Sequence, residues 1–177
     1  GFPSPKGSVE CAEGKAPYIN SCNFDGAGFI LQTTMNVGPT SRGVADPKNL
    51  FSFKQYGEVA TGALVSADAK MGSFGSIYIP ANCRLAEGNP QCRLHVALHG
   101  CEQYPVLVGK AFVEGSGYNE WAEANNIVVL YPASIVVPFQ NPAGCWDWFG
   151  YTGSDYDKVT GPQISAITNM VRRLTEE

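Results

Sequence analysis

Two short apolar runs, joined by one helical segment, constrain the fold of this chain more than any other feature. The runs Leu94–Leu98 and Ile127–Tyr131 are apolar at nearly every position, which is typical of strands buried on both faces of a sheet. Between them, residues 118–125 have helical spacing, with Trp121 and Ala122 on the inward side. Strand, helix and strand in this order form a βαβ unit with parallel strands and a right-handed crossover. The sequence therefore predicts an α/β fold.

Further elements are indicated on both sides of this unit. Alternating apolar and polar residues predict a strand at 50–55, and a second strand is expected at 75–79. A helix is expected over 27–35, and a last helix begins with Pro162 as its first helical residue. Residues 1–22 are predicted to be loop. No internal repeat or linker divides the 177 residues, so we expect one domain.

Composition excludes several classes of partner. The formal net charge is −4 and the twelve Lys and Arg residues are dispersed, which argues against nucleic acid as a partner. No apolar run approaches the length of a membrane span, so no membrane partner is expected. Residues 1–5 lack the basic start and apolar core of a signal peptide, so if the protein is exported its signal is expected upstream of them.

The chain has six cysteines, an even number. Two pairs of cysteines bracket short polar loops, and two further cysteines remain. The chain has no Cys-x-x-Cys motif, which argues against a zinc cluster. We expect three disulfides and an oxidising compartment, although free buried cysteines in a cytosolic protein are an alternative and other pairings are open. The expected disulfides are Cys11–Cys22, Cys83–Cys92 and Cys101–Cys145.

The first apolar run ends at a His-Gly-Cys sequence, which indicates a turn that could carry function. Gly100 has no Cβ, so the backbone can turn sharply after His99. The N–H of Cys101 would then point into a cleft and could serve an oxyanion hole, in which fixed donors stabilise a developing negative charge. The alternative is an ordinary tight turn with a structural disulfide.

No nucleophile accompanies this turn. A Gly-x-Ser-x-Gly elbow must lie between a strand and a helix, and residues 72–75 and 115–117 do not match it. A Cys101 thiol with His99 or His95 as its base is an alternative. The two histidines do not suggest a metal site, because on a strand they would lie roughly 13 Å apart.

A Trp-Asp-Trp sequence supplies the second candidate site. Trp146 and Trp148 could line a groove for an apolar substrate, or they could belong to the core, since tryptophan is mostly buried. We expect a structural role for Asp147, because no third residue accompanies it.

Six segments of the chain resemble the extracellular poly(3-hydroxybutyrate) depolymerases, in the order found in that family. They cover nearly the whole chain, and the resemblance is greatest to the circularly permuted branch, of which the fungal secreted enzyme is the familiar type. The segments are PYINSCNFDGAG (17–28), LHVALHGCEQ (94–103), GYNEWA (117–122), NNIVVLYP (125–132), NPAGCWDW (141–148) and GPQI (161–164).

The resemblance implies a circularly permuted α/β-hydrolase-like fold, with a partial parallel sheet, flanking helices and disulfide staples. Residues 1–177 would form the C-terminal part of a single catalytic domain. The Ser/Asp/His triad would lie in a complementary N-terminal half that is absent from this chain, with the catalytic histidine directly before Gly1. Cys101 matches the backbone oxyanion donor, joined by a disulfide to Cys145, and the family disulfides also match the two local pairs. Trp146 and Trp148 match the lining of the substrate crevice.

The implied activity is that of a secreted carboxylic ester hydrolase, extracellular or periplasmic, acting through an acyl-enzyme. Its substrate would be the insoluble polyester or its soluble oligomers, and no metal or organic cofactor is implied. Two alternatives stay open: a related esterase for feruloyl, acetyl or short-chain esters, and a disulfide-stapled binding module without catalysis.

Overall fold

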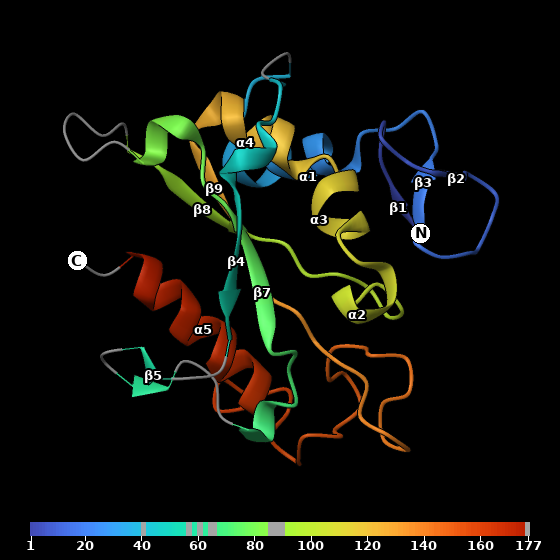
Figure 1. Ribbon diagram of the computed structural model, residues 1–177, viewed down its shortest axis with the longest axis vertical. Helices are drawn as coiled ribbons and strands as arrows, with labels where there is room; N and C mark the ends of the chain where they lie inside the picture. Colours follow the sequence, from blue (N-terminus) through green and yellow to red (C-terminus); the bar gives the residue numbers. More distant parts are fainter. Residues whose placement is uncertain (40–41, 56–57, 60–61, 64–66, 85–90, 176–177) are drawn as a thin grey trace.

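The protein is built around a four-stranded mixed sheet with helices on both faces (Figure 1). The computed structural model describes residues 1–39, 42–55, 58–59, 62–63, 67–84 and 91–175. The strands are, in spatial order, β4 (Leu50–Lys54), β7 (Phe74–Tyr78), β9 (Ile127–Tyr131) and β8 (Arg93–Val96).

Only one strand pair in this sheet is parallel. β8 runs parallel to β9, whereas β9 with β7 and β7 with β4 are antiparallel. The parallel part of the sheet is therefore the β8–β9 pair, and the sequence did not predict the direction of β4 and β7. The reason is connectivity: parallel neighbours need a crossover over the face of the sheet. Among the described residues, β8 and β9 are the only neighbouring strands of this sheet that are joined by a helical crossover.

The predicted βαβ unit is present. Its connection contains α2 (Pro105–Val108), α3 (Ala111–Gly115) and α4 (Tyr118–Asn125). The bounds of α4 and β9 match the sequence prediction, and β8 ends two residues earlier than expected. The Ala97 N–H still donates to Leu130 O at 2.9 Å, so the chain follows β9 beyond the end of β8.

Side-chain alternation along the strands separates two apolar clusters. On one face, Tyr78, Val129 and Tyr131 pack with α4 and with α1 (Gly26–Met35). On the other face, Ile77 and Leu130 pack against α5 (Pro162–Thr175). The sheet is thus the middle of three layers, and the predicted helices at both ends of the chain are confirmed.

Helix α1 is fixed to α4 by an aspartate at its start. Asp25 caps α1 by accepting a hydrogen bond from the Gly28 N–H at 2.8 Å. Its other oxygen accepts from Trp121 Nε1 at 2.9 Å. A Cβ at Gly28 would lie 2.6 Å from the indole of Trp121, so the absence of a side chain there permits close helix packing.

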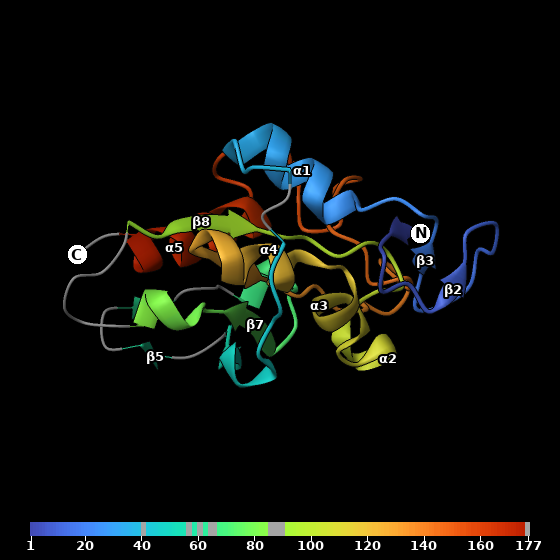
Figure 2. The ribbon, with the colours of Figure 1, turned by 90° about the horizontal axis from the view of Figure 1, so that it is seen from above.

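The segment 1–22 is not only loop, contrary to expectation. It forms a small parallel sheet from β1 (Phe2–Pro3), β2 (Val9–Glu10) and β3 (Ile19–Ser21). Strands of two or three residues are too short to show periodicity, which is why the sequence did not indicate them. These strands lie at the end of the molecule away from α5 (Figure 2).

The remaining described elements are short. β5 pairs antiparallel with β6, and three 3-10 helices complete the described elements. Their bounds are β5 (Glu58–Val59), β6 (Gly62–Ala63), η1 (Pro47–Asn49), η2 (Ala67–Ala69) and η3 (Ala81–Arg84). The structure contains the three expected disulfides, Cys11–Cys22, Cys83–Cys92 and Cys101–Cys145. Across the described residues, no helix has the length and apolar character needed to cross a membrane.

Candidate functional site

The turn after β8 lies in the wall of a cleft of about 430 Å³. Gly100 and Cys101 line this wall, and Gly1 lies in it as well. Its apolar part comes from Phe2, Leu98 and Phe112, and the remaining lining residues are Tyr18, His99 and Gln103. Segments from the start and the middle of the chain therefore meet at the predicted site.

The backbone N–H of Cys101 has no hydrogen-bond acceptor among the described residues. The peptide unit that carries this N–H is nevertheless fixed at its other end, because Gly100 O accepts from His99 Nδ1 at 2.8 Å and from the Gln103 N–H at 3.2 Å. In a trans peptide the N–H and C=O point in opposite directions. Bonds that hold the carbonyl thus orient the N–H, and an oriented donor of this kind suits an oxyanion hole.

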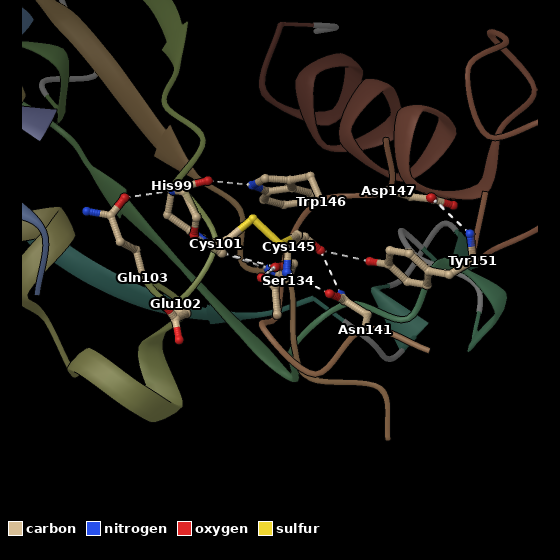
Figure 3. The surroundings of a disulfide bond; sticks show 12 residues. His99, Cys101, Glu102, Gln103, Ser134, Asn141, Cys145, Trp146, Asp147 and Tyr151 are labelled. Carbon is tan, nitrogen blue, oxygen red and sulfur yellow. Dashed lines mark hydrogen bonds between the residues drawn. A yellow bond between two sulfur atoms is a disulfide. The ribbon is translucent and has the colours of Figure 1, made fainter. Parts of the chain in front are cut away.

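The disulfide to Cys145 anchors the turn from a second side. Cys145 is itself clamped by Asn141, whose Oδ1 accepts from its N–H at 2.9 Å and whose Nδ2 donates to its carbonyl at 2.8 Å. Tyr151 also donates its hydroxyl to that carbonyl (Figure 3). Sequence reasoning assigned no role to Asn141, although it stands in one of the family-like segments. Cys101 is therefore attached to a rigid loop.

His99 serves the turn and is not a free base. Its ring is buried, and its two nitrogens have different partners: Nε2 accepts from the Ser134 N–H at 3.0 Å, and Nδ1 donates to Gly100 O. The Ser134 Oγ lies 3.3 Å from His99 Nε2, but its hydroxyl donates to Gly144 O at 2.6 Å, so this His–Ser pair is not a nucleophile with its base. Burial lowers the pKa of His99, and the hydrogen bond to Gly100 O only partly opposes that shift.

The alternative of a thiol nucleophile is wrong for this structure. The sulfur of Cys101 is in a disulfide, and no free cysteine occurs among the described residues. His95 is also unsuited as its base, because its ring packs on Tyr118 with centroids 5.0 Å apart and burial lowers its pKa.

Both histidines should make folding stability depend on pH. Their pKa values in the folded protein lie below the ordinary 6.5. The unfolded chain therefore binds more protons as the pH falls below 6.5, and stability is lost from there downward. For His99 the loss should be at most about 1.4 kcal/mol per pH unit.

Thermal unfolding followed from about pH 7.5 to 5.5, above the range in which carboxyl groups titrate, measures this slope. A His99→Asn variant should be less stable at pH 7.5 and should have a shallower slope. An unchanged slope would contradict the assignment of a neutral, buried ring.

The structure separates the roles of the two tryptophans. Trp146 is half-buried, its Nε1 donates to His99 O at 2.9 Å, and its ring lies 5.3 Å from the His99 ring. Trp146 therefore stabilises the turn through its contacts with His99. Trp148 is 70% exposed and packs edge-on against Phe149. The described lining of the cleft includes neither indole, so a substrate contact by either tryptophan stays a prediction.

Asp147 has the structural role expected for it. Its Oδ1 accepts from the backbone of Gly150 and Tyr151, and its Oδ2 accepts from both the N–H and the hydroxyl of Thr152. Partial burial raises its pKa, but the hydrogen bonds, led by those from Thr152, outweigh burial and hold the pKa below its ordinary value. This carboxylate organises the loop that carries Trp148.

Comparisons with known proteins identify relatives of one kind. No family model matches the chain. The polyhydroxybutyrate depolymerase of Talaromyces funiculosus is 36% identical over 184 residues, which cover 95% of this chain and 50% of the relative. The poly(3-hydroxybutyrate) depolymerase of Delftia acidovorans is 39% identical over 166 residues, which cover 93% of this chain and 31% of the relative.

Solved structures give the same result. The crystal structure of the depolymerase from Penicillium funiculosum superposes with a TM-score of 0.80 at 33% identity. A depolymerase complexed with an R3HB trimer superposes with a TM-score of 0.81 at 34% identity. Each match covers 97% of this chain and 55% of the solved chain. The expected α/β-hydrolase-like fold is confirmed, and the chain spans about half the length of these depolymerases or less. Over the part of these depolymerases that it matches, this chain is similar to them in both sequence and fold.

Proposed function

We propose that this chain is part of a secreted serine esterase that hydrolyses poly(3-hydroxybutyrate) or its oligomers. Its contribution is the Cys101 N–H as oxyanion donor, together with a wall of the substrate cleft. One observation carries the proposal: this N–H has no acceptor among the described residues, and its peptide unit is held by its carbonyl and by a disulfide in a cleft wall.

In the reaction, a serine attacks the ester carbonyl and the carbonyl oxygen becomes an oxyanion. The Cys101 N–H donates to that oxygen as its charge develops, and a fixed donor of this kind accelerates acyl transfer by about 10²–10³-fold. The apolar side chains of Phe2, Leu98 and Phe112 suit the methyl-bearing backbone of hydroxybutyrate. Neither a metal nor an organic cofactor has a part in these steps.

The serine and the other triad members are proposed to lie in a complementary N-terminal half, with residues 1–177 as the C-terminal part of one α/β-hydrolase catalytic domain. The sheet supports this arrangement. The backbone N–H groups of Arg93 and Ala97 donate toward β9. The backbone N–H groups of successive residues point to opposite edges of a strand. Those of Leu94 and Val96 therefore point to the edge of β8 that faces away from β9. No described strand pairs with that edge.

Two further observations agree with the proposal. Gly1 lies in the same cleft as Cys101, so a histidine directly before Gly1 would be close to the reacting ester. The three disulfides favour an oxidising location, either extracellular or periplasmic.

The test compares three classes of ester with the full-length protein, or with this chain assembled with its complementary half. We expect kcat/KM to be higher for hydroxybutyrate trimers than for feruloyl esters, with p-nitrophenyl butyrate as the reference for a small ester. Faster turnover of feruloyl esters would favour the related esterase instead. Binding of trimers without any turnover would favour a binding module.

The two tryptophans should respond differently to substitution. Trp146→Ala removes a half-buried ring and the bond to His99 O, so we expect a loss of about 3 kcal/mol in unfolding free energy. Trp148→Ala should leave stability nearly unchanged, because this side chain is 70% exposed. If Trp148 contacts distal units of the substrate, its removal lowers activity on trimers more than on p-nitrophenyl butyrate.

Val159→Ala is the matched control, because Val159 is another exposed apolar side chain in the same part of the chain. An equal ratio of trimer to small-ester activity in Trp148→Ala, Val159→Ala and the wild type would assign Trp148 no part in substrate binding.

A further inference from the structure

The side chain of Gln103 is fixed by three hydrogen bonds to backbone groups. Its Oε1 accepts from the Gly100 N–H at 2.8 Å, and its Nε2 donates to Pro17 O at 3.0 Å and Tyr18 O at 3.2 Å. An N–H can only donate and a carbonyl can only accept, so the partners determine the orientation of the amide. Gln103 is buried, with 6% of its surface exposed, yet it lies in the wall of the cleft.

These bonds involve both peptide units around Gly100. The side-chain oxygen holds the N–H of the His99–Gly100 unit, and the backbone N–H of Gln103 holds the carbonyl of the Gly100–Cys101 unit. The two neighbouring N–H groups of the turn therefore differ. That of Gly100 is occupied within the protein, and that of Cys101 is left for a substrate.

The hydrogen bond from the Gly100 N–H to the Gln103 side chain requires glycine at position 100. A Cβ at Gly100 would lie 2.8 Å from Gln103 Oε1, so only glycine lets the amide approach this closely. A glycine without such a partner would be free to take other backbone conformations. The Gly100 N–H could then compete with the Cys101 N–H for the same oxygen.

We propose that Gln103 is a positioning residue for ester hydrolysis: by occupying the Gly100 N–H and bracing the turn against residues 17–18, it leaves the Cys101 N–H as the oriented oxyanion donor. This inference rests on the proposed esterase function. Gln103 does not touch the reacting atoms, so its effect should fall on kcat and not on substrate binding.

The kinetic test uses the full-length protein and the variant Gln103→Met, which keeps the length of the side chain and removes the amide. We expect kcat to fall about 10- to 100-fold, with little change in KM. This loss does not exceed the one caused by removing an oxyanion donor altogether. Rates are divided by the number of active sites, counted by titration with a phosphonate that traps the serine. This normalisation removes any effect of a smaller folded fraction.

Gln55 is the matched control. It is fully buried, its Oε1 accepts from the Ala133 N–H at 2.9 Å, and its Nε2 donates to Gly72 O and Ala133 O. Gln55→Met thus breaks the same number and kind of bonds away from the cleft. It should lower the melting temperature without changing kcat per active site. Equal kcat in the wild type and Gln103→Met, or equal losses in the two variants, would overturn the inference.

A second measurement does not depend on activity. In ¹⁵N-labelled protein, the Gly100 N–H should be protected from hydrogen exchange in the wild type and lose that protection in Gln103→Met, whereas the Cys101 N–H should be unprotected in both. Equal exchange at Gly100 in the two proteins would contradict the proposal. If Gln103→Met does not fold, Gln103→Asn takes its place, because its shorter amide cannot reach Gly100 and residues 17–18 together.

The two proposals can fail separately. A full-length protein that hydrolyses no ester and binds no phosphonate would refute the esterase function, and the exchange data would still decide whether Gln103 occupies the Gly100 N–H. An active enzyme with unchanged kcat in Gln103→Met would refute the role of Gln103 alone.

Discussion

This chain by itself should hydrolyse no ester, and the proposed complementary half should raise the rate by about six orders of magnitude, the scale of a complete catalytic triad. The described residues offer candidates for a nucleophile or base at the turn, but each is committed to structure. Cys101 is in a disulfide, the Ser134 hydroxyl donates to a carbonyl, and both nitrogens of His99 have backbone partners. An oxyanion hole without a nucleophile leaves only residual rate acceleration.

The measurement is hydrolysis of p-nitrophenyl butyrate by the purified chain, before and after addition of the complementary half. A serine-directed phosphonate should abolish the restored activity, and the half bearing a serine-to-alanine change serves as the control. Phosphonate-sensitive hydrolysis by this chain alone would show that the nucleophile lies within it. The open edge of β8 leaves backbone N–H and C=O groups without strand partners, so the isolated chain should aggregate, and assembly should suppress this aggregation.

Removal of the disulfide between Cys101 and Cys145 should have the second largest effect, on stability and catalysis together. The bond closes a sequence separation of 44 residues, for which loop-closure entropy gives about 4 kcal/mol. The same change frees the turn at Cys101 from the loop clamped by Asn141. In the assembled enzyme, C101S/C145S should therefore lower kcat by up to about 10²–10³-fold.

The disulfide between Cys83 and Cys92 provides the matched comparison. It closes a separation of 9 residues, for which the same relation gives about 2.6 kcal/mol, and neither cysteine lies in the cleft wall. C83S/C92S should lower the melting temperature and leave kcat per titrated active site unchanged. Equal losses of kcat in the two double variants, measured well below both melting temperatures, would assign the Cys101–Cys145 bond a purely global role.

The local elements of the fold could be predicted because each depends on a pattern close in sequence. The continuous apolar run at Ile127–Tyr131 and the helical spacing at Tyr118–Asn125 gave elements with the observed bounds. The direction of β4 and β7 could not be predicted in this way, because an alternating pattern looks the same in parallel and antiparallel pairs. The His-Gly-Cys pattern and the family-like segments identified the turn at Cys101 as a candidate site, but they assigned no role to Gln103 or Asn141.

The sequence by itself determined the α/β class, the positions of the main strands and helices, the even set of cysteines and the turn that carries the candidate donor. These features follow from periodicity, glycine and residue type, which act within a few positions along the chain. Only the tertiary structure decided what the polar side chains at the turn do. The Trp146 indole reaches a carbonyl 47 residues away, and the Gln103 amide reaches one 86 residues away. No local pattern encodes such contacts, because the cost of burying an amide or an imidazole is offset only by partners that folding brings together.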